Sequence, residues 1–185
     1  MTRIPLVDGD SDDPRLARVF EYFRDREREV PDLYRTLGHA PKLLEGWTSF
    51  AWSLRADAET PRGLRELQIM RVAQLTDAET EWDAHWDMAV QHGNPPEKLG
   101  ELANWAESDA FDDRERAVLA FTDEMTTEVE VSDESFAAVE AQFSAQEVVE
   151  LTLTAAFYSC VSRVLRTLDI EPAEVRPDVL AAMRG

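Results

Sequence analysis

The chain has 185 residues, of which 44% are hydrophobic and 31% charged, and this composition is typical of a globular protein with one buried core. Its formal net charge of −19 argues against nucleic acid and anionic membranes as partners, because both require a basic face. The single cysteine, Cys160, excludes an internal disulfide and agrees with a reducing compartment. Without a membrane-length apolar run or a signal peptide, we expect a cytoplasmic protein that binds no membrane.

Helix signals follow one another along the whole chain and predict an all-α protein of about eight helices. Residues 1–13 are interpreted as an acidic N-terminal tail, and residues 14–185 as a single domain. The expected helices run from Pro14, over 33–37, from Pro41 to about Leu54, from Pro61 to Leu75, from about Asp77 to His92, from Asp112, from Ser132, and from Ala145 to about Leu168. The last of these is long and apolar, so we expect it to be central.

Several predicted helices begin at capping residues. Thr60-Pro61 predicts an N-cap followed by a proline at the first helical position. Thr76 followed three residues later by Glu79 predicts a capping box. Further helix starts are predicted at Asp112-x-x-Glu115, at Ser132 and at Ser144-x-x-Glu147. The segment 127–131 alternates like a strand, but a lone strand is not stable, and we expect a linker.

Glu66, Glu81 and His85 carry the strongest chemical signal. Glu81 and His85 are four residues apart on one predicted helix, and an antiparallel hairpin would return Glu66 to the same level. A histidine exchanges protons near neutral pH, a neighbouring carboxylate fixes its tautomer, and two close carboxylates separate their pKa values. The pattern predicts an acid–base site. The alternative, which spacing alone favours, is a surface Glu–His pair worth a few tenths of a kcal/mol.

Other candidate residues leave more than one interpretation open. Trp82 and Trp86 flank the pair, either as core or interface residues or as the apolar wall of a substrate pocket. Cys160 lies in the apolar last helix and is predicted to be buried and inert. The Glu81–His85 spacing also suits metal ligands on a helix, but it is common by chance, and no metal or cofactor is predicted.

The stretch LRELQIMRVAQLTDAETEWDAHWDMAVQHG (64–93) resembles the core hairpin of the carboxymuconolactone decarboxylase / alkylhydroperoxidase D (AhpD-like) family. Residues 30–54 and 147–172 resemble its flanking helices. In the peroxidase branch a glutamate precedes a CxxCxxxH motif that continues as HxxxAxxxG. Here Glu66 stands at the glutamate position and His85 at the histidine position, while Ala78 and Glu81 replace the two cysteines.

The resemblance implies an all-α AhpD-like fold, a homo-oligomer and a small-molecule substrate. Because both motif thiols are absent, the chain resembles the cysteine-free branch, whose decarboxylases are cofactor-free acid–base enzymes on small lactone acids. We therefore expect an enzyme acting on a small lactone, carbonyl or carboxylate substrate. His85 would be the general acid/base, Glu66 would orient it, and Glu81, at a former cysteine position, would be a second acid/base or a polariser. A thiol peroxidase, a non-catalytic ligand-binding protein and a metal-binding protein remain alternatives.

Overall fold

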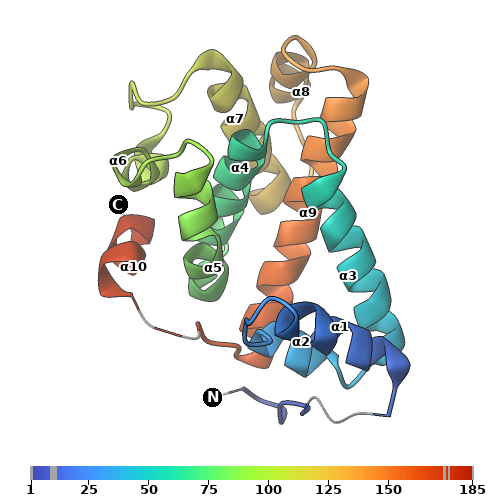
Figure 1. The fold of residues 1–185 in the computed structure, drawn as a ribbon. Coiled ribbons are helices and arrows are strands. Elements are labelled where there is room, and N and C mark those ends of the chain that lie inside the picture. Colours follow the sequence, from blue (N-terminus) through green and yellow to red (C-terminus); the bar gives the residue numbers. More distant parts are fainter. Residues whose placement is uncertain (1, 9–11, 173, 175, 185) are drawn as a thin grey trace.

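The computed structural model describes residues 2–8, 12–172, 174 and 176–184, and these residues form helices and no strands (Figure 1). The all-α prediction is therefore confirmed. The elements are α1 (Pro14–Arg24), α2 (Asp32–Leu37), α3 (Pro41–Ala56), α4 (Arg62–Leu75), α5 (Glu79–Gln91), α6 (Pro96–Gly100), the 3-10 helix η1 (Leu102–Asn104), α7 (Asp113–Thr127), α8 (Asp133–Glu140), α9 (Ala145–Leu168) and α10 (Pro177–Arg184).

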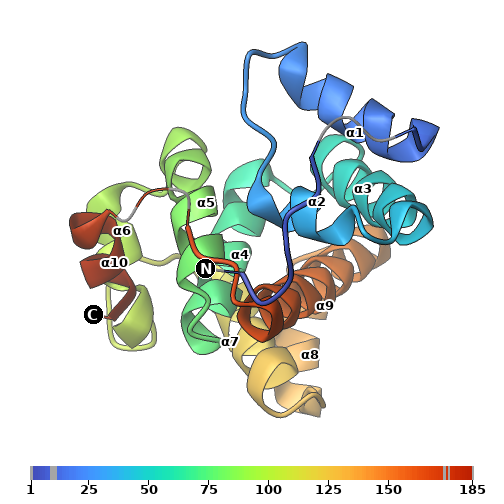
Figure 2. The same ribbon diagram turned by 90° about the horizontal axis from the view of Figure 1, so that it is seen from below.

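Helix α4 is the innermost element, with every residue from Leu64 to Ala73 buried. It packs against α5, α7 and α9 (Figures 1 and 2). An amphipathic helix needs only one apolar face, but a helix enclosed on all sides must also provide partners for its buried polar groups. The buried charged side chains of α4, namely Arg65, Glu66 and Arg71, therefore need partners within the fold. This requirement creates both the candidate site and a structural network.

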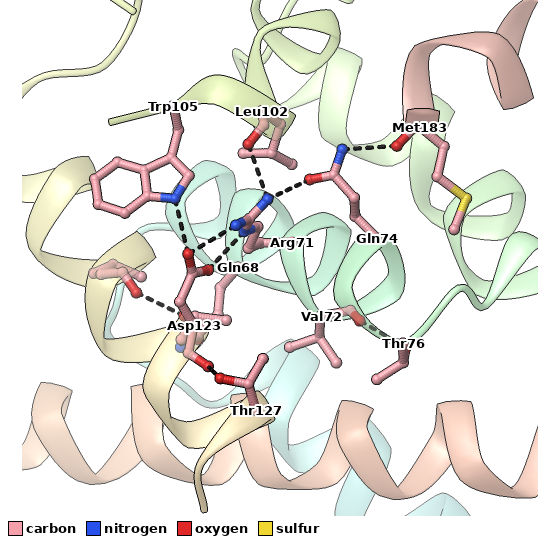
Figure 3. Close-up of polar contacts among 12 residues, drawn as sticks. Gln68, Arg71, Val72, Gln74, Thr76, Leu102, Trp105, Asp123, Thr127 and Met183 are labelled. Carbon is pink, nitrogen blue, oxygen red and sulfur yellow. Dashed lines mark hydrogen bonds and ion pairs between the residues drawn. The ribbon is translucent and has the colours of Figure 1, made fainter. Parts of the chain in front are cut away.

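The structural network is centred on Arg71 and joins α4 to α7 and η1 (Figure 3). Its guanidinium makes two hydrogen bonds, of 2.6 and 2.7 Å, to the Asp123 carboxylate. It also donates to the side chain of Gln74 at 2.7 Å and to the Leu102 carbonyl at 3.1 Å. The Trp105 indole donates to Asp123 at 3.0 Å. Because most N–H groups of the Arg71 guanidinium have acceptors, we interpret this cluster as a set of interactions that holds α4, α7 and η1 together.

Helix α9, predicted as Ala145 to about Leu168, has those bounds. By length and composition alone it could cross a membrane, and it is the one such helix in the described part of the chain. In the fold it packs against α3, α4, α5, α7 and α8, which is the position of a core helix in a bundle. Its outward face stays exposed and carries Cys160. The prediction that Cys160 is buried is therefore wrong, because the residue lies on the face of α9 that no other helix covers.

The helix starts predicted at Asp112-x-x-Glu115 and Ser144-x-x-Glu147 are confirmed, and each forms a capping box with both reciprocal hydrogen bonds. The predicted cap at Thr60 and the predicted box at Thr76–Glu79 are wrong. Thr60 instead donates a 2.6 Å hydrogen bond to Glu150 of α9. Thr76 follows the last turn of α4, and its hydroxyl donates back to a carbonyl of that helix, since α5 begins only at Glu79.

Helices α6 and α10 were not predicted. The run Gly93-Asn94-Pro95-Pro96 signals the end of α5, but Pro96 also opens the five-residue α6. Helix α10 packs beside α5 (Figure 1). The described part of the N-terminal segment lies beside α2 and the end of α9 (Figure 2), with a hydrogen bond of 2.9 Å from the Arg3 amide to the Leu168 carbonyl.

Candidate functional site

The structure brings Glu66, Glu81 and His85 into direct contact. His85 Nδ1 lies 2.7 Å from Glu66 Oε2, and His85 Nε2 lies 3.1 Å from Glu81 Oε1. Helix α4 supplies Glu66 and helix α5 supplies the other two residues. The residues are buried, with 0%, 5% and 2% of their surface exposed in sequence order. The alternative of a surface Glu–His pair is therefore wrong.

A third charged group, which the sequence analysis missed, completes the surroundings of Glu66. Arg62 lies one helical turn before Glu66 on α4 and forms an ion pair with Oε1, the carboxylate oxygen that does not face His85. The signal was present, because Arg62 and Glu66 have the i,i+4 spacing of a helical ion pair. Each oxygen of the Glu66 carboxylate therefore has a partner, Arg62 on one side and His85 on the other.

The two contacts of His85 fix the number of protons in the site. A neutral imidazole carries one N–H, whereas both ring nitrogens here face carboxylate oxygens. Two hydrogen bonds therefore require either an imidazolium between two carboxylates or a neutral ring beside one protonated carboxyl group. In both forms the three side chains share one transferable proton.

Electrostatics favour the form with a charged ring. Burial opposes the charge on His85, but Glu66 and Glu81 together raise the pKa of the imidazole above its usual value. Burial also opposes the charge on Glu66, yet His85 and Arg62 hold the pKa of that carboxyl below its usual range. The exchangeable proton is therefore held on the imidazole.

Tyr158 of α9 packs against His85 on another side of the site. Its ring meets the His85 ring edge-on, with 5.0 Å between the centroids and 87° between the planes. Burial raises the pKa of Tyr158 to about 12, so its hydroxyl keeps its proton at neutral pH. The hydroxyls of Tyr158 and Tyr34 both lie beside the guanidinium of Arg55. None of these three residues was singled out in the sequence.

Comparison with known proteins identifies the region that carries this site. Residues 41–124 match the model of the Carboxymuconolactone decarboxylase family, from the start of α3 into α7. This segment of the chain is therefore similar to the carboxymuconolactone decarboxylase family. Glu66, Glu81 and His85 all lie within it. A search of curated proteins found no significant match.

Solved structures extend the likeness to the whole fold. An uncharacterised peroxidase-related protein with an alkylhydroperoxidase AhpD core, from Ralstonia eutropha JMP134, is 20% identical, with a TM-score of 0.80 over 98% of this chain and 96% of that one. A peroxidase-related protein from Silicibacter sp. TM1040 is also 20% identical, with a TM-score of 0.77 over 92% and 90%. These matches show an AhpD-like fold.

The debrominase Bmp8 has the same fold, with 18% identity and a TM-score of 0.79 over 98% of this chain and 97% of that one. A cysteine-to-alanine variant of Bmp8 in complex with 2,3,4-tribromopyrrole is 19% identical, with a TM-score of 0.79 over 100% and 98%. Proteins of this fold therefore differ in the activities for which they are named, and the residues of each site must decide its chemistry.

Within this family fold, Trp82 and Trp86 belong to an apolar cluster beside the site. Trp82 is fully buried, and its indole donates a 2.9 Å hydrogen bond to the Val179 carbonyl of α10. Trp86 lies against Trp82, with 5.8 Å between the ring centroids. Both therefore pack as core residues under α10. The suggestion that they also wall a substrate pocket stays a prediction.

Two further features bear on the alternatives. Cys160 lines a surface hollow of about 440 Å³ on α9. It is two residues from Tyr158, which places the two side chains on roughly opposite faces of the helix. Cys160 therefore points away from His85. Among the residues that the structure describes, no group of three or more His, Cys, Asp or Glu side chains has the arrangement of a metal site.

Proposed function

We propose that this protein is a cofactor-free acid–base enzyme that acts on a small lactone, carbonyl or carboxylate substrate. One observation carries the proposal: a buried imidazole whose two nitrogens contact two different carboxylates, at 2.7 and 3.1 Å. Such a group can give up one proton and take up another without moving, and positioned proton transfer of this kind contributes about 10²–10⁴-fold in rate.

The two sides of the imidazole have different tasks in this proposal. Glu66 makes the shorter contact, is fully buried and is held by Arg62, so it orients His85 through Nδ1. Glu81 makes the longer contact and keeps a slight exposure, so the substrate enters between Glu81 and Nε2. The Glu81 carboxylate takes a proton from the carbon beside the substrate carbonyl, and the imidazolium gives its Nε2 proton to the carbonyl oxygen. In the return step the protonated Glu81, after exchange with solvent, gives a proton to the carbon, and His85 Nε2 takes back the proton of the enol hydroxyl, so that the carbonyl and the starting protonation states are restored.

The thiol chemistry of the peroxidase branch has no residues to support it here. Dithiol reduction of a peroxide requires a thiolate and a resolving thiol, but Ala78 and Glu81 stand at the two cysteine positions. Cys160 lies on another helix with its side chain directed outward. The proposed acid–base role of Glu81 uses the position that a thiol holds in the peroxidases.

We also propose that the enzyme works as a homo-oligomer. Large apolar side chains are exposed on both α3 and α9. Among them are Phe50, whose ring lies 5.2 Å from that of Phe157, and Leu153, one helical turn before Phe157. Isolated exposed apolar residues are ordinary, whereas a group of them on adjacent helices supports a subunit contact. A second subunit would bury these side chains.

The proposal is tested by proton exchange, which requires no knowledge of the natural substrate. Levulinate, a small keto acid, and α-angelica lactone are incubated in D2O, and loss of the proton signals beside the carbonyl is followed by NMR. We expect the wild-type protein to accelerate the exchange of at least one probe. The His85→Ala variant should lose this activity while its circular dichroism spectrum and thermal unfolding remain those of a folded protein.

A further inference from the structure

Tyr34, Arg55 and Tyr158 form a polar cluster that the proton-transfer steps above do not use. They come from α2, α3 and α9 and meet beside the Glu66–His85–Glu81 site. Both tyrosines are buried, with 6% and 3% of their surface exposed. The Nε of Arg55 is also buried and has no hydrogen-bond partner among the described residues. Burying a charged donor in this way is costly unless an acceptor is supplied.

The hydrogen-bonding capacity of the cluster points to an acceptor from outside the chain. A guanidinium has five N–H donors and no acceptor, so in its contacts with Tyr34 and Tyr158 it donates and the hydroxyl oxygens accept. Each hydroxyl therefore still has a proton to donate. Three donors, Arg55 Nε–H and the two tyrosine O–H groups, thus lie together, and Arg55 Nε–H has no acceptor among the described residues.

The charges around the cluster favour an anionic acceptor. Arg55 has no ion pair within 4.0 Å among the described residues, although the charge of Glu81 acts on it over a longer distance. With the His85 imidazole protonated, Arg55, Arg62 and His85 carry three positive charges against the two carboxylates of the site. One negative charge would balance the group. The edge contact between Tyr158 and His85 places the cluster next to the ring that transfers the proton.

We propose that Arg55, Tyr34 and Tyr158 form an oxyanion subsite, which binds a negatively charged oxygen of the substrate beside His85. This inference rests on the proposed acid–base function and adds a substrate class to it. The oxygen belongs either to a carboxylate that the substrate already carries or to the enolate that develops during proton transfer. In both cases the three donors stabilise negative charge in a site from which water is largely excluded.

Two probes distinguish these sources: levulinate and its methyl ester, which differ only in the charged carboxylate. Binding is measured by ligand-observed NMR and proton exchange in D2O, for the wild type and for Arg55→Gln, Tyr34→Phe and Tyr158→Phe. If the subsite holds a carboxylate, we expect these changes to weaken levulinate binding, by about tenfold or more for Arg55→Gln, and to leave the ester unaffected. If it holds an enolate, we expect unchanged binding and slower exchange of both probes.

The tyrosine variants separate this role from a purely electrostatic one. If Arg55 served only as the counter-ion of Glu81, Arg55→Gln would shift the pH profile, while the two Phe variants, which keep every charge, would behave like wild type. That result would overturn the proposal. Arg55→Lys keeps the charge without the Nε donor, so we expect at most partial recovery. Arg26, which lies over the Tyr22 ring with 3.8 Å to its centroid, provides the matched control Arg26→Gln, expected to have no effect.

The outcomes also separate this inference from the proposed function. Binding of levulinate that depends on Arg55, without any proton exchange, would support the subsite and contradict the acid–base role. Exchange that depends on His85 but is equal in wild type, Arg55→Gln and both Phe variants would contradict the subsite alone. A wild-type protein that neither binds nor exchanges either probe would count against both.

Discussion

At the scale of single residues, the pairing of His85 with two carboxylates makes the stability of the protein depend on pH. The pKa of His85 is raised above 6.5 in the folded state, so its contribution to stability is complete below about pH 6.5. It is lost as the pH rises through the folded pKa. Glu66 has the opposite sign, because its folded pKa lies below 4.5 and its contribution disappears as the pH falls through that value.

The raised pKa of His85 gives a prediction for the stability of the His85→Gln variant. The difference in free energy of unfolding between wild type and variant should be largest at about pH 5.5 to 6.5 and smaller at about pH 9.5. Urea denaturation at several pH values measures it, with the exposed His39→Gln as a control for a general histidine effect. A difference that does not change with pH would show that the imidazole is not charged by its partners.

The site could be predicted from the sequence only where its geometry is local. Glu81 and His85 follow from helical spacing, and Glu66 follows from the hairpin of α4 and α5 together with the family resemblance. Arg55 and Tyr158 did not emerge, because they lie 30 and 73 residues from His85 on helices of their own. Their contact depends on the packing angles of α3 and α9, which apolar periodicity does not determine.

At the scale of the elements, the Arg71–Asp123 pair is predicted to fasten α4 to α7. The Asp123→Asn substitution leaves the buried guanidinium without its carboxylate, and we expect a loss of about 2–3 kcal/mol. The exposed pair Arg166–Asp77 provides the control, since Asp77→Asn should cost less than about 1 kcal/mol. Thermal and urea unfolding measure both. Equal losses of stability in Asp123→Asn and Asp77→Asn would show that the Arg71 network does not hold α4 and α7 together.

Helix boundaries show the same limit of local information. The boxes at Asp112 and Ser144 form because their helices begin at the surface, where the cap competes only with water. Thr60 and Thr76 also carry hydroxyls, but these donate hydrogen bonds elsewhere: Thr60 to the Glu150 carboxylate and Thr76 to a backbone carbonyl of α4. Helix α10 was not predicted because it is short, and its buried residues Val179, Leu180 and Met183 pack on a core cluster that contains Trp82.

At the scale of the whole molecule, the exposed apolar side chains of α3 and α9 predict self-association. The chain has a mass of 21.0 kDa, and we expect light scattering to give a multiple of that mass. Leu153→Asp places a charge in the apolar group and should lower the mass, whereas the exposed Glu97→Gln, on α6, which packs against α10 and η1, should not. A wild-type mass of 21.0 kDa across the concentration range would contradict the proposed oligomer.

In the proposed mechanism His85, held between Glu66 and Glu81, transfers its proton to the carbonyl oxygen of the substrate. Deuterium incorporation into levulinate and α-angelica lactone, measured for wild type and His85→Gln under identical conditions, tests it most directly. We expect exchange by the wild type and a loss of about 10²-fold or more in a His85→Gln protein that remains folded. A folded His85→Gln protein that exchanges protons at the wild-type rate would contradict it.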